Sequence, residues 1–146
     1  MASEAQFDKA RFAFKTEFLD AKDQVSKFVR GAYLNDKNTV EFYVLQGYSP
    51  NLQNQNGDTP VMAAACAGNT GILKYLLQHG GDPDFRNNDG ITALMYAVAN
   101  GRNEAARLLI SAGADKTIAT KDGITAEEIA RLLGNMGAIE LLKDEI

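Results

Sequence analysis

The sequence predicts an all-α fold, a solenoid in which helix–turn–helix units stack side by side. A Gly-x-Thr motif recurs every 33 residues, beginning at Gly57, Gly90 and Gly123. Two further glycine series keep the same spacing: Gly68, Gly101 and Gly134, and Gly47, Gly80 and Gly113. A fixed period of this length is typical of repeat proteins, in which each unit contacts only its neighbours.

Each unit contains signals for two helices and a connecting loop. Thr59, Thr92 and Thr125 are expected to cap a first helix, because a threonine hydroxyl accepts from the free amides at a helix start. Pro60 follows the first of them, at the position where a missing N–H is tolerated. A glycine near the ninth position then ends the helix in the left-handed conformation. A leucine-rich second helix and a polar loop such as residues 80–89 complete the unit.

This pattern resembles the ankyrin repeat. The resemblance rests on the segments DTPVMAAACAGN, ITALMYAVANGR, YLLQHGGDPD and LLISAGADKT, and it covers roughly residues 24–143. It implies one domain, residues 1–146, with β-turn-like loops between the helix pairs. Its parts would be an N-terminal capping helix (1–22), a degenerate first repeat (23–56), two regular repeats (57–89 and 90–122) and a C-terminal capping repeat (123–146). Met62 and Met95 stand where the family has a histidine.

The residues before the repeats are expected to form a helix. Phe7, Ala10, Phe14 and Phe18 recur at helical spacing, and Ser3 and Gln6 have the spacing of a capping box. We favour the interpretation that this phenylalanine stripe covers the exposed end of the solenoid, because terminal repeats need a cover. A partner-binding helix is the alternative.

The two terminal units differ from the regular ones. In the first unit, Ser26 lies 33 residues before Thr59 and is expected to cap, and Asn35 replaces the helix-ending glycine. Asparagine also tolerates the left-handed conformation. In the last unit, Glu127 and Glu128 replace apolar residues, which indicates a polar end to the array.

Composition excludes several classes of function. The net charge is −4 and the pI is near 5.0, so no general basic field exists to hold nucleic acid. A single cysteine excludes an internal disulfide framework and suits a reducing compartment. No apolar run approaches a membrane span, and the charged N-terminus lacks the apolar core of a secretory signal. We expect a cytoplasmic, monomeric, single-domain protein.

The sequence does not indicate an enzyme, a cofactor or a metal site. His79 has no Cys or Asp at metal-ligand spacing, and Cys66 lies among alanines, where a packed thiol is the expected state. Asp82 and Asp115 are expected to accept from nearby backbone amides in turns. Tyr96 is expected to pack in the core, with its hydroxyl reaching solvent or a neighbour.

Recognition of another protein is therefore the predicted function, in the role of inhibitor or regulator. The resemblance implies that the partner contacts the loop tips and the concave face. The matching tip residues are Gln55, Asn56, Asp58, Asn88, Asp89, Ile91, Lys121 and Ile124, and the inner-helix residues are Tyr33, Cys66, Ala67, Ala99 and Asn100. Ile91 and Ile124 are the informative ones: either they face solvent for a partner, or they pack against the neighbouring tip. A small-molecule binder or enzyme with a site in the concave groove is an alternative hypothesis, and a host-directed bacterial effector is a third.

Overall fold

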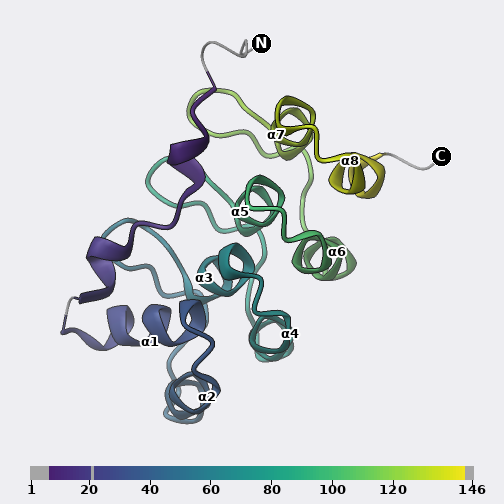
Figure 1. The fold of residues 1–146 in the computed structure, drawn as a ribbon. Coiled ribbons are helices and arrows are strands. Elements are labelled where there is room, and N and C mark those ends of the chain that lie inside the picture. Colours follow the sequence, from purple (N-terminus) through teal and green to yellow (C-terminus); the bar gives the residue numbers. More distant parts are fainter. Residues whose placement is uncertain (1–6, 21, 144–146) are drawn as a thin grey trace.

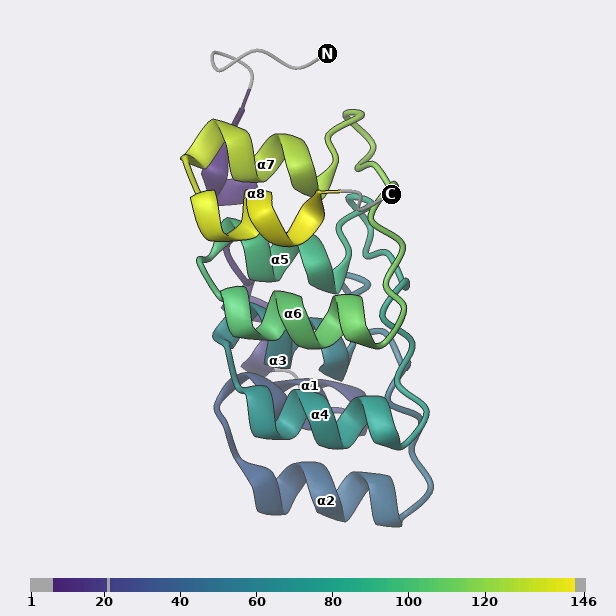
Figure 2. The same ribbon diagram turned by 90° about the vertical axis from the view of Figure 1, so that its right-hand side faces the viewer.

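The structure is a computed structural model that describes residues 7–20 and 22–143. Helix pairs stack side by side, which confirms the predicted all-α solenoid (Figure 1). The inner row consists of α1 (Gln24–Tyr33), α3 (Pro60–Ala67), α5 (Ala93–Ala99) and α7 (Ala126–Leu133). The outer row consists of α2 (Lys37–Leu45), α4 (Thr70–Gln78), α6 (Asn103–Ser111) and α8 (Met136–Leu142), and Figure 2 shows this row face on. We call the surface formed by the inner row the inner-helix face; it corresponds to the expected concave face.

The predicted capping threonines cap their helices. The side chains of Thr59, Thr92 and Thr125 each accept from the backbone amide three residues later, at 3.1, 3.3 and 3.3 Å. Gly68 and Gly134 end α3 and α7 in the left-handed conformation, with φ of 76° and 67°. These local signals therefore set the length of the inner helices, as expected.

The first unit differs from expectation at its start. Asp23, rather than Ser26, caps α1: its carboxylate accepts from the Ser26 amide at 2.9 Å and from the Ser26 hydroxyl at 2.8 Å. Aspartate is as good a cap as serine, and here it uses the buried serine as a second donor. Asn35 takes a positive φ of 61°, as predicted.

Polar side chains at one register position join each unit to the one before it. Asn69 donates to the Ala32 carbonyl oxygen at 2.8 Å, and Asn135 donates to that of Val98 at 3.1 Å. Arg102, midway between them in the sequence, donates through Nε to the Cys66 carbonyl oxygen at 3.2 Å. These bonds satisfy carbonyl groups at or next to the C-terminal turns of the inner helices, which the helices themselves leave free.

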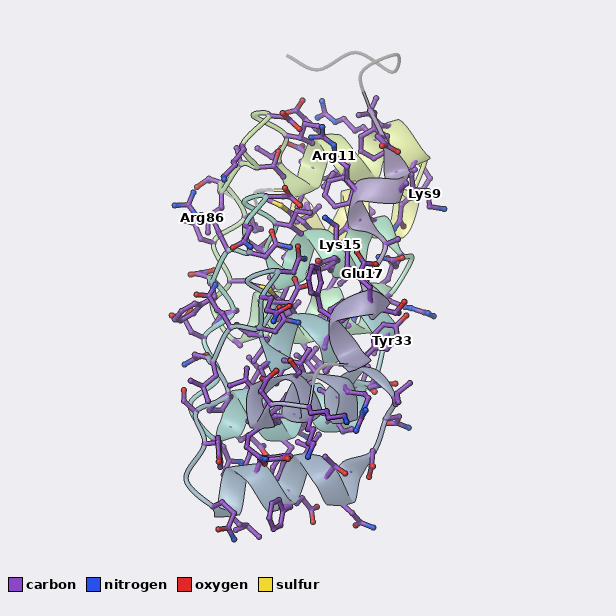
Figure 3. All side chains as sticks on the ribbon, turned by 90° about the vertical axis from the view of Figure 1, so that its left-hand side faces the viewer. Lys9, Arg11, Lys15, Glu17, Tyr33 and Arg86 are labelled. Carbon is purple, nitrogen blue, oxygen red and sulfur yellow. The ribbon has the colours of Figure 1, made fainter. Side chains whose placement is uncertain are left out.

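The N-terminal segment, which we define as residues 7–20, is not the expected helix. It forms two short 3-10 helices, η2 (Lys9–Phe12) and η3 (Thr16–Asp20), joined through extended backbone at Ala13. The segment runs along the inner-helix face from the α7 end to the α1 end (Figures 1 and 3). The prediction of a helix that covers the end of the solenoid is therefore wrong for these residues. The expected capping box of Ser3 and Gln6 lies outside the described residues.

The physical reason is the spacing of the buried rings. Phe12 and Phe14 are both buried against the array, with exposed fractions of 3% and 8%. Two residues that are two positions apart point the same way only in extended backbone, since an α-helix would direct them to different faces. At the first unit, the end that the helix was expected to cover, Phe42 and Leu45 of α2 remain exposed.

None of the helices in the described part of the chain is long and apolar enough to cross a membrane.

Replacing Gly57 by alanine is expected to lower the free energy of unfolding by about 1–3 kcal/mol. Gly57 has a φ of 81°, and a Cβ there would lie 2.7 Å from the Asn88 backbone nitrogen of the next tip. The matched control is Gly71→Ala in α4, where a Cβ meets nothing within 4 Å. Alanine in a helix is expected to be neutral or stabilising by up to about 1 kcal/mol. Urea unfolding measures both, and equal effects of the two changes would contradict the argument.

Candidate functional site

A buried polar network joins the tips of the second and third repeats. The Asp58 carboxylate is fully buried and accepts from Asn56 Nδ2 at 2.8 Å, Asn87 Nδ2 at 3.0 Å and the Tyr96 hydroxyl at 2.8 Å. Burial raises the pKa of Asp58, against the lowering effect of these hydrogen bonds and of the Lys15 charge. Burial and the Asp58 charge also raise the pKa of the Tyr96 hydroxyl, which therefore stays a donor. Asn56 and Asp58, two of the predicted contact residues, thus face inward rather than toward a partner.

The side-chain amide of Asn54, in the same tip as Asp58, shows what happens to this position without the acceptors of the network. Asn54 lies one period before Asn87, and its side-chain oxygen accepts from the amides of Asn56 and Asp58. Its Nδ2 is buried without a partner among the described residues. The residues one period before Asp58 and Tyr96 are Val25 and Ala63, which offer no acceptor.

Ile91 and Ile124 do not face solvent. They are only 1% and 5% exposed, and they line a shallow depression together with Phe12. The hypothesis of solvent-facing isoleucines at the tips is therefore wrong, and the alternative, a packing role, is what the structure shows. Phe12 of the N-terminal segment lines the same depression as both isoleucines.

Phe14 of the N-terminal segment lies between two tyrosines of the inner-helix face. Its ring centroid is 4.7 Å from that of Tyr33, in a stacked arrangement, and 5.8 Å from that of Tyr96. Two residues before Phe14, the Phe12 carbonyl oxygen accepts from Asn100 Nδ2 at 2.9 Å. Offset aromatic pairs at these separations are favourable beyond their buried area. The segment is thus seated on predicted inner-helix residues, Tyr33 and Asn100 among them.

Ion pairs connect the N-terminal segment to the loop tips on each side of Phe12 and Phe14. Arg11 pairs with Asp122, and Lys15 Nζ lies 3.8 Å from the Asp89 carboxylate. All four side chains are about half exposed, so each pair is worth roughly 0–1 kcal/mol and is weakened by salt. Burying each phenylalanine ring contributes more, about 1.5–3 kcal/mol. The rings therefore hold the segment, and the charges set its register.

The predicted residues that remain accessible fall into two places. Gln55, Asn88 and Lys121 are exposed and follow one another at a spacing of 33 residues along the tips. Asn88 Nδ2 donates to the Gln55 carbonyl oxygen at 2.9 Å, which ties the first two tips together. At the other end of the inner helices, a surface pocket is lined by residues that include Tyr33, Leu34, Ala67 and Asn100. Leu34 is 62% exposed, whereas Ala99 is buried and unavailable for contact.

The side chains considered for chemistry have ordinary packed or exposed positions. Burial is the main cause that raises the pKa of the Cys66 thiol to about 12. His79 is exposed at the end of α4, with Nδ1 2.7 Å from the Tyr75 carbonyl oxygen. Asp82 and Asp115 accept from the amides of Asp84 and Thr117, as predicted. Within the described ranges, no three His, Cys, Asp or Glu residues gather as metal ligands do.

Sequence reasoning missed four of the residues that seat the N-terminal segment: Arg11, Phe12, Lys15 and Asp122. A signal was present in the run Arg11-Phe12-Ala13-Phe14-Lys15, where aromatic residues alternate and basic residues flank them. This period of two indicates extended backbone with one apolar face, rather than a helix.

Stacked helix pairs with polar tips and an ordered inner face define a helical-repeat protein of the kind that presents surfaces to other proteins. The family model for ankyrin repeats, in three copies, matches residues 28–120, more than half of the 146 residues. The chain therefore belongs to the ankyrin repeat family, whose repeats are general protein–protein interaction modules. No curated protein matches its sequence.

Tyr96→Phe is expected to lower the free energy of unfolding by about 1–3 kcal/mol, because it leaves the buried Asp58 carboxylate with one donor fewer. Tyr75→Phe in α4 is the matched control, since the Tyr75 hydroxyl makes no hydrogen bond to any described residue. Urea unfolding of the two variants measures the difference. A loss as small for Tyr96→Phe as for Tyr75→Phe would show that the network does not contribute to stability.

The alkylation rate of Cys66 is expected to rise about tenfold per pH unit from pH 7 to pH 11. The reason is that the raised pKa keeps the thiolate a minor species over this range. An ordinary thiol, with a pKa of about 8.5, levels off above roughly pH 9. Iodoacetamide labelling followed by mass spectrometry measures the rate, with glutathione as the reference thiol. A plateau near pH 9 for Cys66 would contradict the buried state.

Proposed function

We propose that this protein binds a partner protein through its exposed loop tips and the open part of the inner-helix face. The observation that supports this most directly is the pocket beside Phe14, where Tyr33 and the exposed Leu34 stand next to Ala67 and Asn100. Aromatic residues in partly enclosed positions are typical anchors of protein interfaces. The ordered row of tips, with Gln55, Asn88 and Lys121 exposed, supplies a polar rim.

We further propose that the protein acts as an inhibitor or regulator, that is, by occupying a surface of its partner. A partner held on the proposed docking surface would have its contacted residues covered, so steric occlusion is the effect that this geometry supports. The single cysteine suits action in the cytoplasm, and we expect the protein to act as a monomer.

Affinity capture from the native cell, followed by reconstitution with the purified partner, tests this function. Ala67→Arg in the pocket and Lys121→Glu at the tips are each expected to weaken binding at least tenfold, about 1.4 kcal/mol. Lys74→Glu is the matched control for Lys121→Glu, because it makes the same charge change at an exposed position of α4 in the outer row. Isothermal titration calorimetry gives the affinities.

Two outcomes would contradict the proposal. One is that no protein binds with defined stoichiometry. The other is that Lys74→Glu weakens binding as much as the two changes on the proposed surface. Ile91 and Ile124 are unsuitable for this test, since a charge at either buried position would disturb folding.

A further inference from the structure

The N-terminal segment occupies the middle of the inner-helix face, next to the open part through which we propose that a partner docks. Figure 3 shows it in front of the inner helices, with Arg11 and Lys15 turned toward the tips and Tyr33 beside the segment. Its secondary structure is limited to the two short 3-10 helices. The segment is therefore positioned mainly by the contacts of its side chains with the array, rather than by a hydrogen-bonded framework of its own.

We call the part of the inner-helix face beneath the segment the groove. It combines aromatic, apolar and polar residues. Tyr33 and Tyr96 form an aromatic slot that holds one ring, with Cys66 and Ala67 beside it. Ile91 and Ile124 form an apolar floor for a second ring.

The rim of the groove has two kinds of polar group. Asn100 Nδ2 donates to a backbone carbonyl oxygen between the two rings. The Asp89 and Asp122 carboxylates supply negative charge along the tips.

The sequence that fits this groove is the segment's own run from Arg11 to Lys15. Two aromatic residues two positions apart fill the slot and the floor, and a basic residue on each side pairs with a tip carboxylate. All of these contacts are made by side chains or by a carbonyl group. None of them requires the segment to be covalently attached to the array, so a separate polypeptide of the same pattern makes the same contacts.

We propose that residues 9–16 are an intrachain ligand that closes the docking groove, and that the partner presents a segment with the same pattern, basic–aromatic–x–aromatic–basic. Binding then proceeds by exchange, in which the partner segment replaces the chain's own. This inference rests on the proposed function and specifies the class of partner and its regulation.

The strength of the ion pairs and the effect of the tether favour a segment that a partner can replace over one that closes the groove permanently. Both ion pairs are about half exposed and are screened by salt, so they hold the segment weakly. The tether keeps the segment near its groove at an effective concentration of about 1 mM, so a free segment of equal intrinsic affinity has to exceed that concentration to displace it. The closed groove therefore selects against weak ligands, and any change that releases residues 9–16 increases the affinity for the partner.

The test uses the full chain and a fluorescein-labelled peptide of residues 7–18, FDKARFAFKTEF. In the variant Phe12→Ala with Phe14→Ala, the peptide is expected to bind at least tenfold more tightly than in the wild type, because the competing segment has lost its rings. A peptide with alanine at both phenylalanine positions is expected not to bind. Fluorescence anisotropy at low and high salt measures the affinities, which are expected to fall as the salt concentration rises.

Cys66 provides an independent readout, because it lies beside Phe14 and is the single cysteine. Its alkylation is expected to be faster in the released variant than in the wild type and to slow down when the peptide is added. Lys9→Ala, a change at an exposed residue of the same segment, is the control and is expected to behave as the wild type. If the double alanine variant does not melt cooperatively, Arg11→Glu with Lys15→Glu replaces it, since both positions are at the surface.

Three results would overturn the inference. The first is a folded, released variant that does not bind the peptide. The second is equal peptide affinity in the wild type and the released variant. The third is a wild-type dimer in sedimentation that is lost on release, which would assign the groove to the segment of a second copy.

The same experiments distinguish a failure of this inference from a failure of the proposed function. If the released variant binds the peptide but neither form captures a partner protein, the intrachain ligand stands and the docking function does not. If a partner binds the open surface and the peptide does not compete with it, the docking function stands and the inference does not.

Discussion

No helix pair in this protein can bury its apolar surface without a neighbour. The first helices of the regular repeats carry several alanines, and almost every side chain of α3 and α5 is buried in the stack. The outer helices bury only one side, with Leu73 and Leu76 of α4 and Leu109 of α6 facing inward. Because each interface is shared by two units, stability is a property of the stack rather than of any single repeat.

The same small residues shape the surface on which we propose that a partner docks. Some alanine positions of the inner helices hold a large side chain in a neighbouring repeat. Tyr96 is one such side chain, since the residues one period away are Ala63 and Ile129. Its hydroxyl satisfies the buried Asp58, and its ring contacts Phe14. One residue thus couples the interior of the array to the segment that lies on its inner-helix face.

The N-terminal segment limits which of the predicted contact residues a partner can reach. Cys66, Ile91 and Ile124 were predicted to contact a partner, but the described surface around them is partly occupied by the chain's own Phe12 and Phe14. The residues left exposed, Gln55, Asn88 and Lys121, are at the rim. Access to the groove is therefore linked to the position of residues 9–16.

The sequence by itself determined the repeat, because capping threonines and left-handed glycines act within a few residues and the 33-residue period makes each signal visible several times. The prediction that Ser26 caps the first helix was wrong, because Asp23, three residues earlier, is an equally good cap. Only the tertiary structure decided the place of the N-terminal segment and the burial of Asp58, Ile91 and Ile124. Those outcomes depend on contacts such as Phe12 with Asn100 and Arg11 with Asp122, between residues far apart in the chain. Local propensity and periodicity contain no information about such pairs, and one sequence read alone does not reveal which surface an aromatic residue will meet.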